Sequence, residues 1–217
     1  MLTVPFIVRG LRDIIFRVGR VDYLAKLYFK YGCMGSSKSM DLIRTAFNYR
    51  ERGQNPVVMT SSIDTRVESG TIASRMGFNE KAVAITGNMN LYDYIKDLIV
   101  NENKVVDVIL VDEVNFLTRV QIWQLSDIVD KLSIAVIAFG LRSDFRGQLF
   151  PGTEQLMAIA DKIEEIKAMC HCGKKATINA RIKEGKVLYE GNQIEVGFGY
   201  IALCRKCWKE GKLESSI

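Results

Sequence analysis

The sequence has a single histidine, His171, among its 217 residues. Because only this residue is available, any mechanism that requires a catalytic histidine is nearly excluded. Long apolar runs are also missing, since no stretch reaches the roughly 20 residues that a membrane-spanning helix requires. The basic residues are scattered, and a formal net charge of +5 is small for a chain of this length. These features argue against a membrane protein and against a nucleic-acid-binding surface.

The composition is that of an ordinary globular protein, with 48% hydrophobic and 25% charged residues. The length suits one compact domain with a small appendage. Residues 1–24 form an extension of uncertain role, in which arginines alternate with apolar residues. A targeting peptide, a short amphipathic helix on the body of the protein and a later translation start all stay open. Asp13 and Asp22 favour the last two, because acidic residues are unusual in transit peptides.

Apolar patterning predicts alternating strands and helices from residue 25 to about residue 166. Strands are expected over residues 25–31, 57–60, 83–86, 105–111 and 134–139. Helices are expected over residues 39–52, 91–100 and 118–132, the last capped by Thr118. The polar stretch 61–79 is expected to be a mobile loop. Such alternation predicts a mostly parallel sheet with helices on both faces.

The pattern changes after Cys170, where short polar strands, glycines and cysteine pairs replace long helices. We therefore expect two parts after the N-terminal extension. Residues 25–169 would form an α/β domain, and residues 170–217 a small metal-binding β module. No internal repeat or low-complexity segment is visible in the sequence.

Residues 32–39 read GCMGSSKS and follow a predicted strand. The phosphate-loop pattern G-x-x-x-x-G-K-[ST], between a strand and a helix, holds phosphates with backbone N–H groups and the helix N-terminus. Lys38 would then reach the outer phosphates, and Ser39 would hold Mg²⁺. Ser37 replaces the usual second glycine, which lets the backbone approach phosphate closely. On this motif alone, an ordinary polar loop before a helix is the alternative.

Two carboxylates, Asp112 and Glu113, follow the apolar run VVDVILV. In parallel sheets, ligands bind at the carboxyl ends of the strands. Asp112 suits a second Mg²⁺ contact, and Glu113 would take a proton from an acceptor hydroxyl. A solvated turn before a helix is the alternative, and the phosphate loop in the same chain weakens it.

Four of the five cysteines form two close pairs, Cys170 with Cys172 and Cys204 with Cys207. Four thiolates suit a tetrahedral zinc ion and leave no open position, so the site would be structural. His171 lies inside the first pair and is expected to point outwards, although it is able to replace one thiolate. Cys33 is expected to be a small packing residue rather than a nucleophile.

These motifs, in this order, resemble those of the cytosolic (type II) thymidine kinases, and of their bacterial members in particular. The resemblance rests on KLYFKYGCMGSSKS, SSIDTR, VDEVNFLT, GLRSDFRGQLFPG, CHCGKKAT and LCRKC, and covers residues 25 to about 208. It implies ATP- and Mg²⁺-dependent phosphorylation of the 5′-hydroxyl of thymidine, with deoxyuridine as a further candidate, in deoxynucleotide salvage. It also implies a structural zinc, a cytoplasmic homotetramer, and no nucleic-acid or membrane partner.

The resemblance also assigns roles to individual positions. It makes Glu113 the catalytic base, and Ser39 and Asp112 the Mg²⁺ contacts. The residues expected to bind ATP are Gly32, Cys33, Met34, Gly35, Ser36, Ser37, Lys38, Ser39, Asp64, Thr65, Arg66, Asp112, Glu113, Val114 and Asn115. Those expected to bind the nucleoside are Met34, Phe116, Phe145, Gln193, Ile194, Glu195, Val196, Gly197 and Tyr200. Zinc would be held by Cys170, Cys172, Cys204 and Cys207.

The sequence departs from the family pattern at Ser37 and at Asn115, where glutamine is usual. The closing loop before Cys204 is also about two residues shorter than expected. Three rival functions follow. One is another phosphate-loop enzyme, either an ATPase or a kinase for a different nucleoside. The others are a zinc-ribbon nucleic-acid-binding protein and an inactive paralogue of the kinase. The modest charge counts against nucleic-acid binding.

Overall fold

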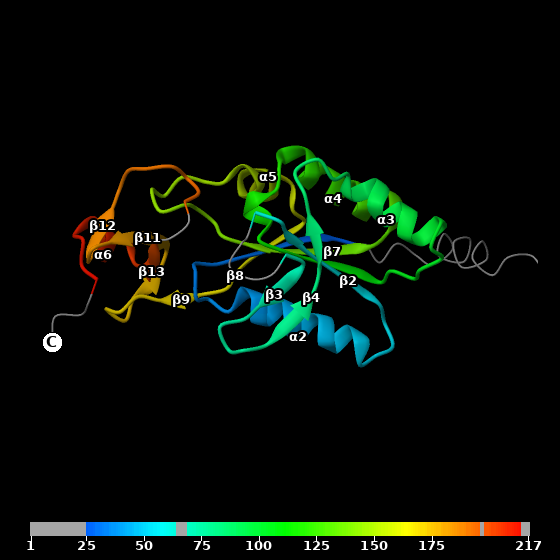
Figure 1. Ribbon diagram of the computed structural model, residues 1–217, viewed down its shortest axis with the longest axis horizontal. Coiled ribbons are helices and arrows are strands. Elements are labelled where there is room, and N and C mark those ends of the chain that lie inside the picture. The colour runs from blue at the N-terminus through cyan, green and yellow to red at the C-terminus, as the bar shows by residue number, and fades with distance from the viewer. Residues whose placement is uncertain (1–24, 64–68, 196–197, 214–217) are drawn as a thin grey trace, which may run out of the picture.

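The computed structural model describes residues 25–63, 69–195 and 198–213 (Figure 1). The expectations for residues 1–24, and for Asp64, Thr65, Arg66, Val196 and Gly197, lie outside the described residues. Within the described part of the chain, no helix has the length and apolar character needed to cross a bilayer.

A six-stranded sheet forms the main body, in the strand order β5-β2-β6-β7-β1-β8. Every pairing between neighbouring strands in it is parallel, as expected for strands that alternate with helices. Its strands are β1 (Leu27–Tyr31), β2 (Pro56–Ser61), β5 (Val83–Ile85), β6 (Val108–Asp112), β7 (Ala135–Gly140) and β8 (Lys162–Glu165). The expected α/β core is therefore confirmed.

Helices cover both faces of this sheet. One face carries α2 (Lys38–Arg50), and the other carries α3 (Leu91–Val100), α4 (Arg119–Leu132) and α5 (Pro151–Ile159), as Figure 1 shows. All five residues of β6 are buried. Alternate side chains of a strand point to opposite faces, so Leu110 packs with α2 residues and Ile109 with residues of α3 and α4. Each face of the sheet thus packs against its helices through an apolar cluster.

The C-terminal region begins with β9 (Ala168–Met169), which pairs with β10 (Lys175–Ala176). Antiparallel strands β11 (Ile178–Lys183), β12 (Lys186–Leu188) and β13 (Gly199–Leu203) then form a small sheet, followed by the short helix α6 (Arg205–Lys209). These elements gather at one end of the molecule, on the left of Figure 1. The expected small β module is present, and its first strand begins before residue 170.

Two expectations about secondary structure are wrong. The stretch 61–79 contains strand β3 (Thr71–Ala73), which pairs antiparallel with β4 (Asn79–Lys81). The Ser74 N–H donates to the Phe78 carbonyl across the turn, at 2.8 Å. The strand predicted over residues 105–111 begins later than expected, at Val108. The first pair between β2 and β6 joins Pro56 to Val108, and Val105 lies outside the sheet with 60% of its surface exposed.

Candidate active site

A cavity of about 590 Å³ lies where strands β1, β2, β6 and β7 reach their carboxyl ends. Thr60, Asp112 and Leu141, at or just beyond the ends of three of these strands, contribute to its floor. The remaining walls come from the phosphate loop, the β3–β4 turn, the loop after β7 and the segment before β13. Parallel strands leave such a crevice at their carboxyl ends, where ligands bind.

The predicted phosphate loop connects β1 to α2 in a tight turn. A Cβ atom on Gly32 would lie 2.4 Å from the Ile166 carbonyl oxygen, so this position requires glycine. Lys38 is 7% exposed, and its Nζ donates to the carbonyls of Gly32 at 3.1 Å and of Cys33 at 2.9 Å. Ser37 has a φ of 67° and ψ of 27°, in the left-handed region that glycine adopts most easily. The backbone thus keeps a glycine-like conformation at Ser37.

The two residues expected to hold Mg²⁺ lie side by side. The Ser39 hydroxyl donates to Asp112 Oδ2 at 2.8 Å, which joins the first turn of α2 to the end of β6. Burial, reinforced by the neighbouring Glu113 carboxylate, raises the pKa of Asp112 to about 7. A bound cation would stabilise this buried carboxylate. The adjacent oxygens and their charge therefore fit a hard, oxygen-binding divalent ion.

Glu113 follows Asp112 in a left-handed conformation, with a φ of 51°. Its N–H donates to Asp112 Oδ1 at 3.0 Å, so one carboxylate fixes the backbone that carries the other. Glu113 is 6% exposed and lines the cavity. A non-glycine residue held at positive φ costs about 1–3 kcal/mol and is a common feature of active sites.

The cavity is lined by seven of the twelve predicted ATP-site residues that the structure describes. Those that line it are Met34, Gly35, Ser37, Lys38, Ser39, Asp112 and Glu113. Gly32, Cys33 and Ser36 belong to the loop without lining the cavity. Val114 is buried in the apolar core, and the Asn115 Oδ1 accepts from the Leu141 N–H at 2.9 Å. The structure therefore shows Val114 and Asn115 supporting the site from behind.

Aromatic side chains also line the cavity. Phe116 contacts Phe150 edge-to-face, with ring centroids 5.7 Å apart. Phe145 and Tyr200 line the same space, and Phe145 is only 1% exposed. The other predicted nucleoside-site residues that line the cavity are Met34, Gln193, Ile194 and Glu195. A planar base would find flat apolar surfaces here.

Polar residues that the sequence did not single out connect the walls. Asn179 of β11 accepts from the Met34 N–H at 2.7 Å and donates to the Ser143 carbonyl at 3.1 Å. Asp144 is 3% exposed and accepts from Gln193 Nε2 at 3.2 Å. The pattern INARI places Asn179 and Arg181 at alternate strand positions, hence on one face. That spacing was the available signal for two buried polar side chains.

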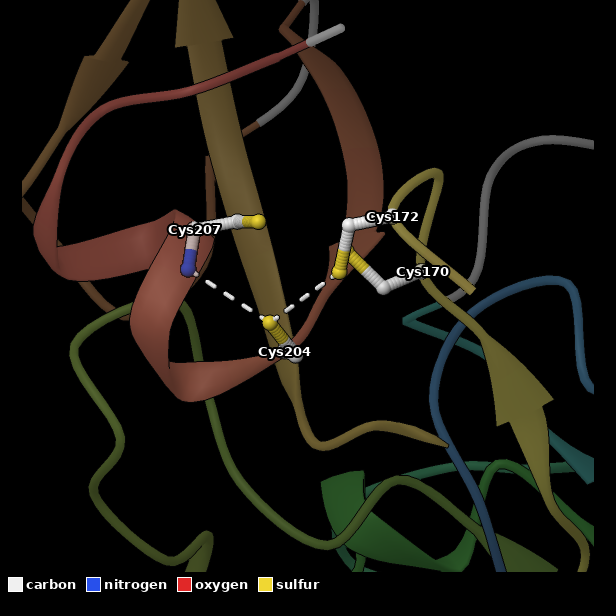
Figure 2. Close-up of side chains that lie close together, drawn as sticks. All are labelled: Cys170, Cys172, Cys204 and Cys207. Atoms are coloured by element: carbon white, nitrogen blue, oxygen red, sulfur yellow. Dashed lines mark hydrogen bonds between the residues drawn. The ribbon is translucent and has the colours of Figure 1, made fainter. Parts of the chain in front are cut away.

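The four paired cysteines form one cluster (Figure 2), with their sulfurs within 4.8 Å of one another. Cys172 Sγ and Cys204 Sγ are 3.7 Å apart. A tetrahedral ion with Zn–S bonds of about 2.3 Å would place its sulfurs about 3.8 Å apart. The Cys207 N–H donates to Cys204 Sγ at 3.4 Å, and this bond lowers the pKa of Cys204 to about 7. The cluster therefore fits a structural metal ion.

His171 lies outside this cluster. Its Nε2 is 3.1 Å from the Lys212 carbonyl oxygen, so the ring is held by the backbone near the end of α6. Cys33, the fifth cysteine, is buried and packs with the cluster residues and Ala180. Burial raises the pKa of the Cys33 thiol, as suits a packing residue.

Comparison with known proteins gives a consistent result. The family model described as thymidine kinase matches residues 25–208. The thymidine kinase of Francisella tularensis subsp. tularensis (strain SCHU S4 / Schu 4) is 42% identical over 199 residues, covering 88% of this chain and 100% of that protein. The enzyme of Legionella pneumophila (strain Lens) is 47% identical, with 87% and 91% covered. That of Lactococcus lactis subsp. lactis (strain IL1403) is 46% identical, with 84% and 96% covered.

Proposed function

Because the chain belongs to the thymidine kinase family, we propose that its cavity transfers the γ-phosphoryl group of ATP to the 5′-hydroxyl of thymidine. The observation that carries this proposal is a single cavity that is lined by the phosphate loop, by the carboxylates of Asp112 and Glu113 and by aromatic rings. Such a lining offers groups for the donor phosphates and for a planar base in the same cavity. The products would be thymidine monophosphate and ADP.

The phosphate loop and Lys38 bind the donor phosphates. The backbone N–H groups at the start of α2 would donate to the anionic oxygens, and Lys38, whose Nζ donates to the Gly32 carbonyl, would add positive charge. Mg²⁺ held by Ser39 and Asp112 would neutralise charge on the transferring group. Asp64, Thr65 and Arg66 stay predicted nucleotide contacts.

Glu113 acts as the general base. The 5′-oxygen of the nucleoside forms a bond to the γ-phosphorus, the bond from that phosphorus to the bridging oxygen of ADP breaks, and Glu113 takes the hydroxyl proton. The backbone of Glu113 is fixed by Asp112, so its carboxylate enters the cavity from a rigid position. Pre-positioned bases of this kind contribute about 10²–10⁴-fold to the rate.

The aromatic end of the cavity binds the nucleoside. Phe116 and Phe145 would enclose the thymine ring, while Gln193, Ile194, Glu195 and Tyr200 contact its edge or its sugar. Val196 and Gly197 stay predictions of the same kind. Close walls would exclude water, so that ATP is not simply hydrolysed.

The metal in the cysteine cluster would be zinc, in a structural role, since all four positions are protein sulfurs. The division at residue 170 stays a prediction from the change in sequence pattern. A homotetrameric assembly, a cytoplasmic location and activity on deoxyuridine stay predictions of the family resemblance.

The direct test is to supply purified protein with ATP, Mg²⁺ and either thymidine, deoxyuridine or deoxycytidine, and to measure nucleoside monophosphate and ADP separately. Thymidine monophosphate should form together with equal ADP. ADP without any nucleotide product would indicate an ATPase. Salt-dependent binding to DNA or RNA in a protein without kinase activity would favour the zinc-ribbon alternative.

A further inference from the structure

Arg181, on β11, is a completely buried arginine, with 0% exposure. Its guanidinium forms an ion pair with Glu195 at 2.7 Å, and its Nε donates to the Tyr200 hydroxyl at 2.9 Å. Its Nη2 donates to the carbonyls of Asn192 at 2.9 Å and of Gln193 at 3.3 Å. A buried arginine is costly unless its donors are satisfied. Here Tyr200 of β13 and the segment before β13 accept these hydrogen bonds.

The same guanidinium stacks on the cavity wall. Its Cζ lies 3.8 Å from the centroid of the Phe145 ring. Phe145 lines the cavity, whereas Arg181 lies behind it. The chain also passes close by at Gly191, where a Cβ atom would lie 3.1 Å from Arg181 Nη1 and 3.7 Å from Phe145 Cζ. Arg181 therefore contacts both the ring and the segment that together form this wall.

A second set of bonds holds the segment from the other side. Gln193 Nε2 donates to Asp144 Oδ2 at 3.2 Å, and Arg146 Nη1 donates to the Gly191 carbonyl at 3.3 Å. Arg146 is also paired with Asp144 at 2.8 Å. The loop after β7 and the strand β11 thus hold residues 191–195 between them. Within the described residues, Arg181 makes its polar contacts to this segment and to Tyr200.

From these contacts we infer that Arg181 is a positioning residue for the nucleoside. It orders residues 191–195 and the Phe145 ring into one rigid wall, without touching the substrate. This inference rests on the proposed function. None of its contacts involves the phosphate loop or the Asp112–Glu113 pair. Loss of Arg181 should therefore weaken nucleoside binding and leave donor binding largely intact.

Lysine should be a poor substitute at this position. Arginine presents five N–H donors in a planar fork that stacks on an aromatic ring, whereas lysine is a point charge with three donors. Arg181→Lys would keep the charge opposite Glu195. It would lose the stacking on Phe145 and some of the bonds to Tyr200 and to the two carbonyls.

The test compares Arg181→Met and Arg181→Lys with wild type, using steady-state kinetics with thymidine and ATP varied separately. We expect the KM for thymidine to rise about 10- to 100-fold in Arg181→Met, and less in Arg181→Lys. The KM for ATP should stay within about twofold of wild type, because its site is not contacted. Arg119→Met is the matched control, since Arg119 forms an exposed ion pair with Glu154 away from the cavity. Its constants should not change.

The outcomes separate the inference from the function. A wild-type chain that phosphorylates no thymidine would overturn the proposed function, and this role with it. Active wild type with an unchanged thymidine KM in Arg181→Met would overturn the positioning role alone. An equal rise in both KM values, with a lower melting temperature, would do the same by showing general structural support.

Two milder variants keep the test decisive if Arg181→Met fails to fold. Glu195→Gln and Tyr200→Phe each remove one partner of the guanidinium and leave Arg181 in place. Because both side chains are also proposed to contact the nucleoside, each variant is measured alone and combined with Arg181→Lys. A several-fold rise in the thymidine KM that does not add to the rise in Arg181→Lys would assign the effect to the guanidinium contact, and fully additive rises would overturn the inference. Unchanged thymidine KM values in both variants would overturn the inference.

Discussion

The six-stranded sheet and the C-terminal region, residues 168–213, bury different kinds of groups. The sheet buries aliphatic and aromatic side chains between its covering helices, in a core that includes Leu27, Phe29, Ile109 and Val136. The C-terminal region buries three of its four cysteines, together with Asn179 and Arg181, around few large apolar side chains. The first region is stabilised by area removed from water, and the second by specific polar and metal-binding groups.

In the proposed function, the two regions would serve different substrates. The donor phosphates would bind at the end of the sheet, where Asp112 accepts hydrogen bonds from the Ser39 hydroxyl and from the Glu113 N–H. The nucleoside would depend on the C-terminal region, where a few directed contacts hold a small structure. Regions this small rarely fold on apolar burial alone and often require a metal. Damage to the second region should therefore affect nucleoside binding before it affects the sheet.

The largest effect should follow loss of the metal. Cys204→Ser removes one of four sulfurs, and structural zinc contributes an apparent binding free energy of about 10–16 kcal/mol in small domains. We expect zinc content to fall from about one per chain and thymidine binding to be lost, with ATP binding weakened far less. Metal analysis and calorimetry with each substrate would measure this.

His171→Ala is the matched control for the zinc experiment, because His171 lies between two ligands but contacts the Lys212 carbonyl instead. It should keep its zinc. A Cys204→Ser protein that is metal-free yet binds thymidine normally would contradict the claim that thymidine binding depends on the metal in the C-terminal region.

A core substitution should give the opposite pattern. Leu110→Ala removes a fully buried side chain of β6, and such changes cost about 2–5 kcal/mol of unfolding free energy. Zinc content should not change, because the cysteines are not contacted. Denaturant unfolding would measure the loss. Val105→Ala is the control, with an expected change within about 0.5 kcal/mol, because Val105 is largely exposed.

The smallest effect concerns the phosphate loop. Ser37→Gly should relieve the strain of the left-handed backbone conformation at this residue and stabilise the fold. The gain should be about 1 kcal/mol or less, because glycine also increases the conformational entropy of the unfolded chain. Ser126→Gly, inside α4, should instead destabilise it by about 1 kcal/mol. Thermal unfolding that shows a stabilising Ser37→Gly and a destabilising Ser126→Gly would support the strained geometry at Ser37. Stability changes of the same sign in both variants would contradict it.

The sheet region was largely predictable from sequence, because its information is local. Residues 91–100 form a helix as expected, and Thr118 caps α4 through a capping box with Gln121. The start of β6 was set too early because Val105 continues the apolar run, and nothing local shows where pairing begins. The hairpin β3–β4 was missed because its strands have only three residues each and β4 is polar, although Gly77, with a φ of 86°, lies in its turn.

The sequence predicted the motifs of the site, but not the hydrogen bonds that connect them. Sequence order places Asp112 beside Glu113, but the bond from Ser39 to Asp112 joins residues that are 73 positions apart. Asn179 reaches Met34 across 145 positions. Long-range contacts of this kind follow from the packing of the C-terminal region on the sheet, which no local pattern encodes. Asp144 was missed for the same reason, whereas the alternation in INARI was a local signal for Arg181.

The central claim is that Glu113 is the base at the sheet end of a thymidine kinase site, and Glu113→Gln tests it most directly. Glutamine keeps the size and polarity of glutamate but cannot accept the proton as a carboxylate does. Asp112→Asn serves as the comparison and should mainly raise the Mg²⁺ requirement. Steady-state kinetics at several Mg²⁺ concentrations should show that Glu113→Gln lowers kcat by about 10²–10⁴-fold at every concentration. A near-native kcat in Glu113→Gln would contradict the account.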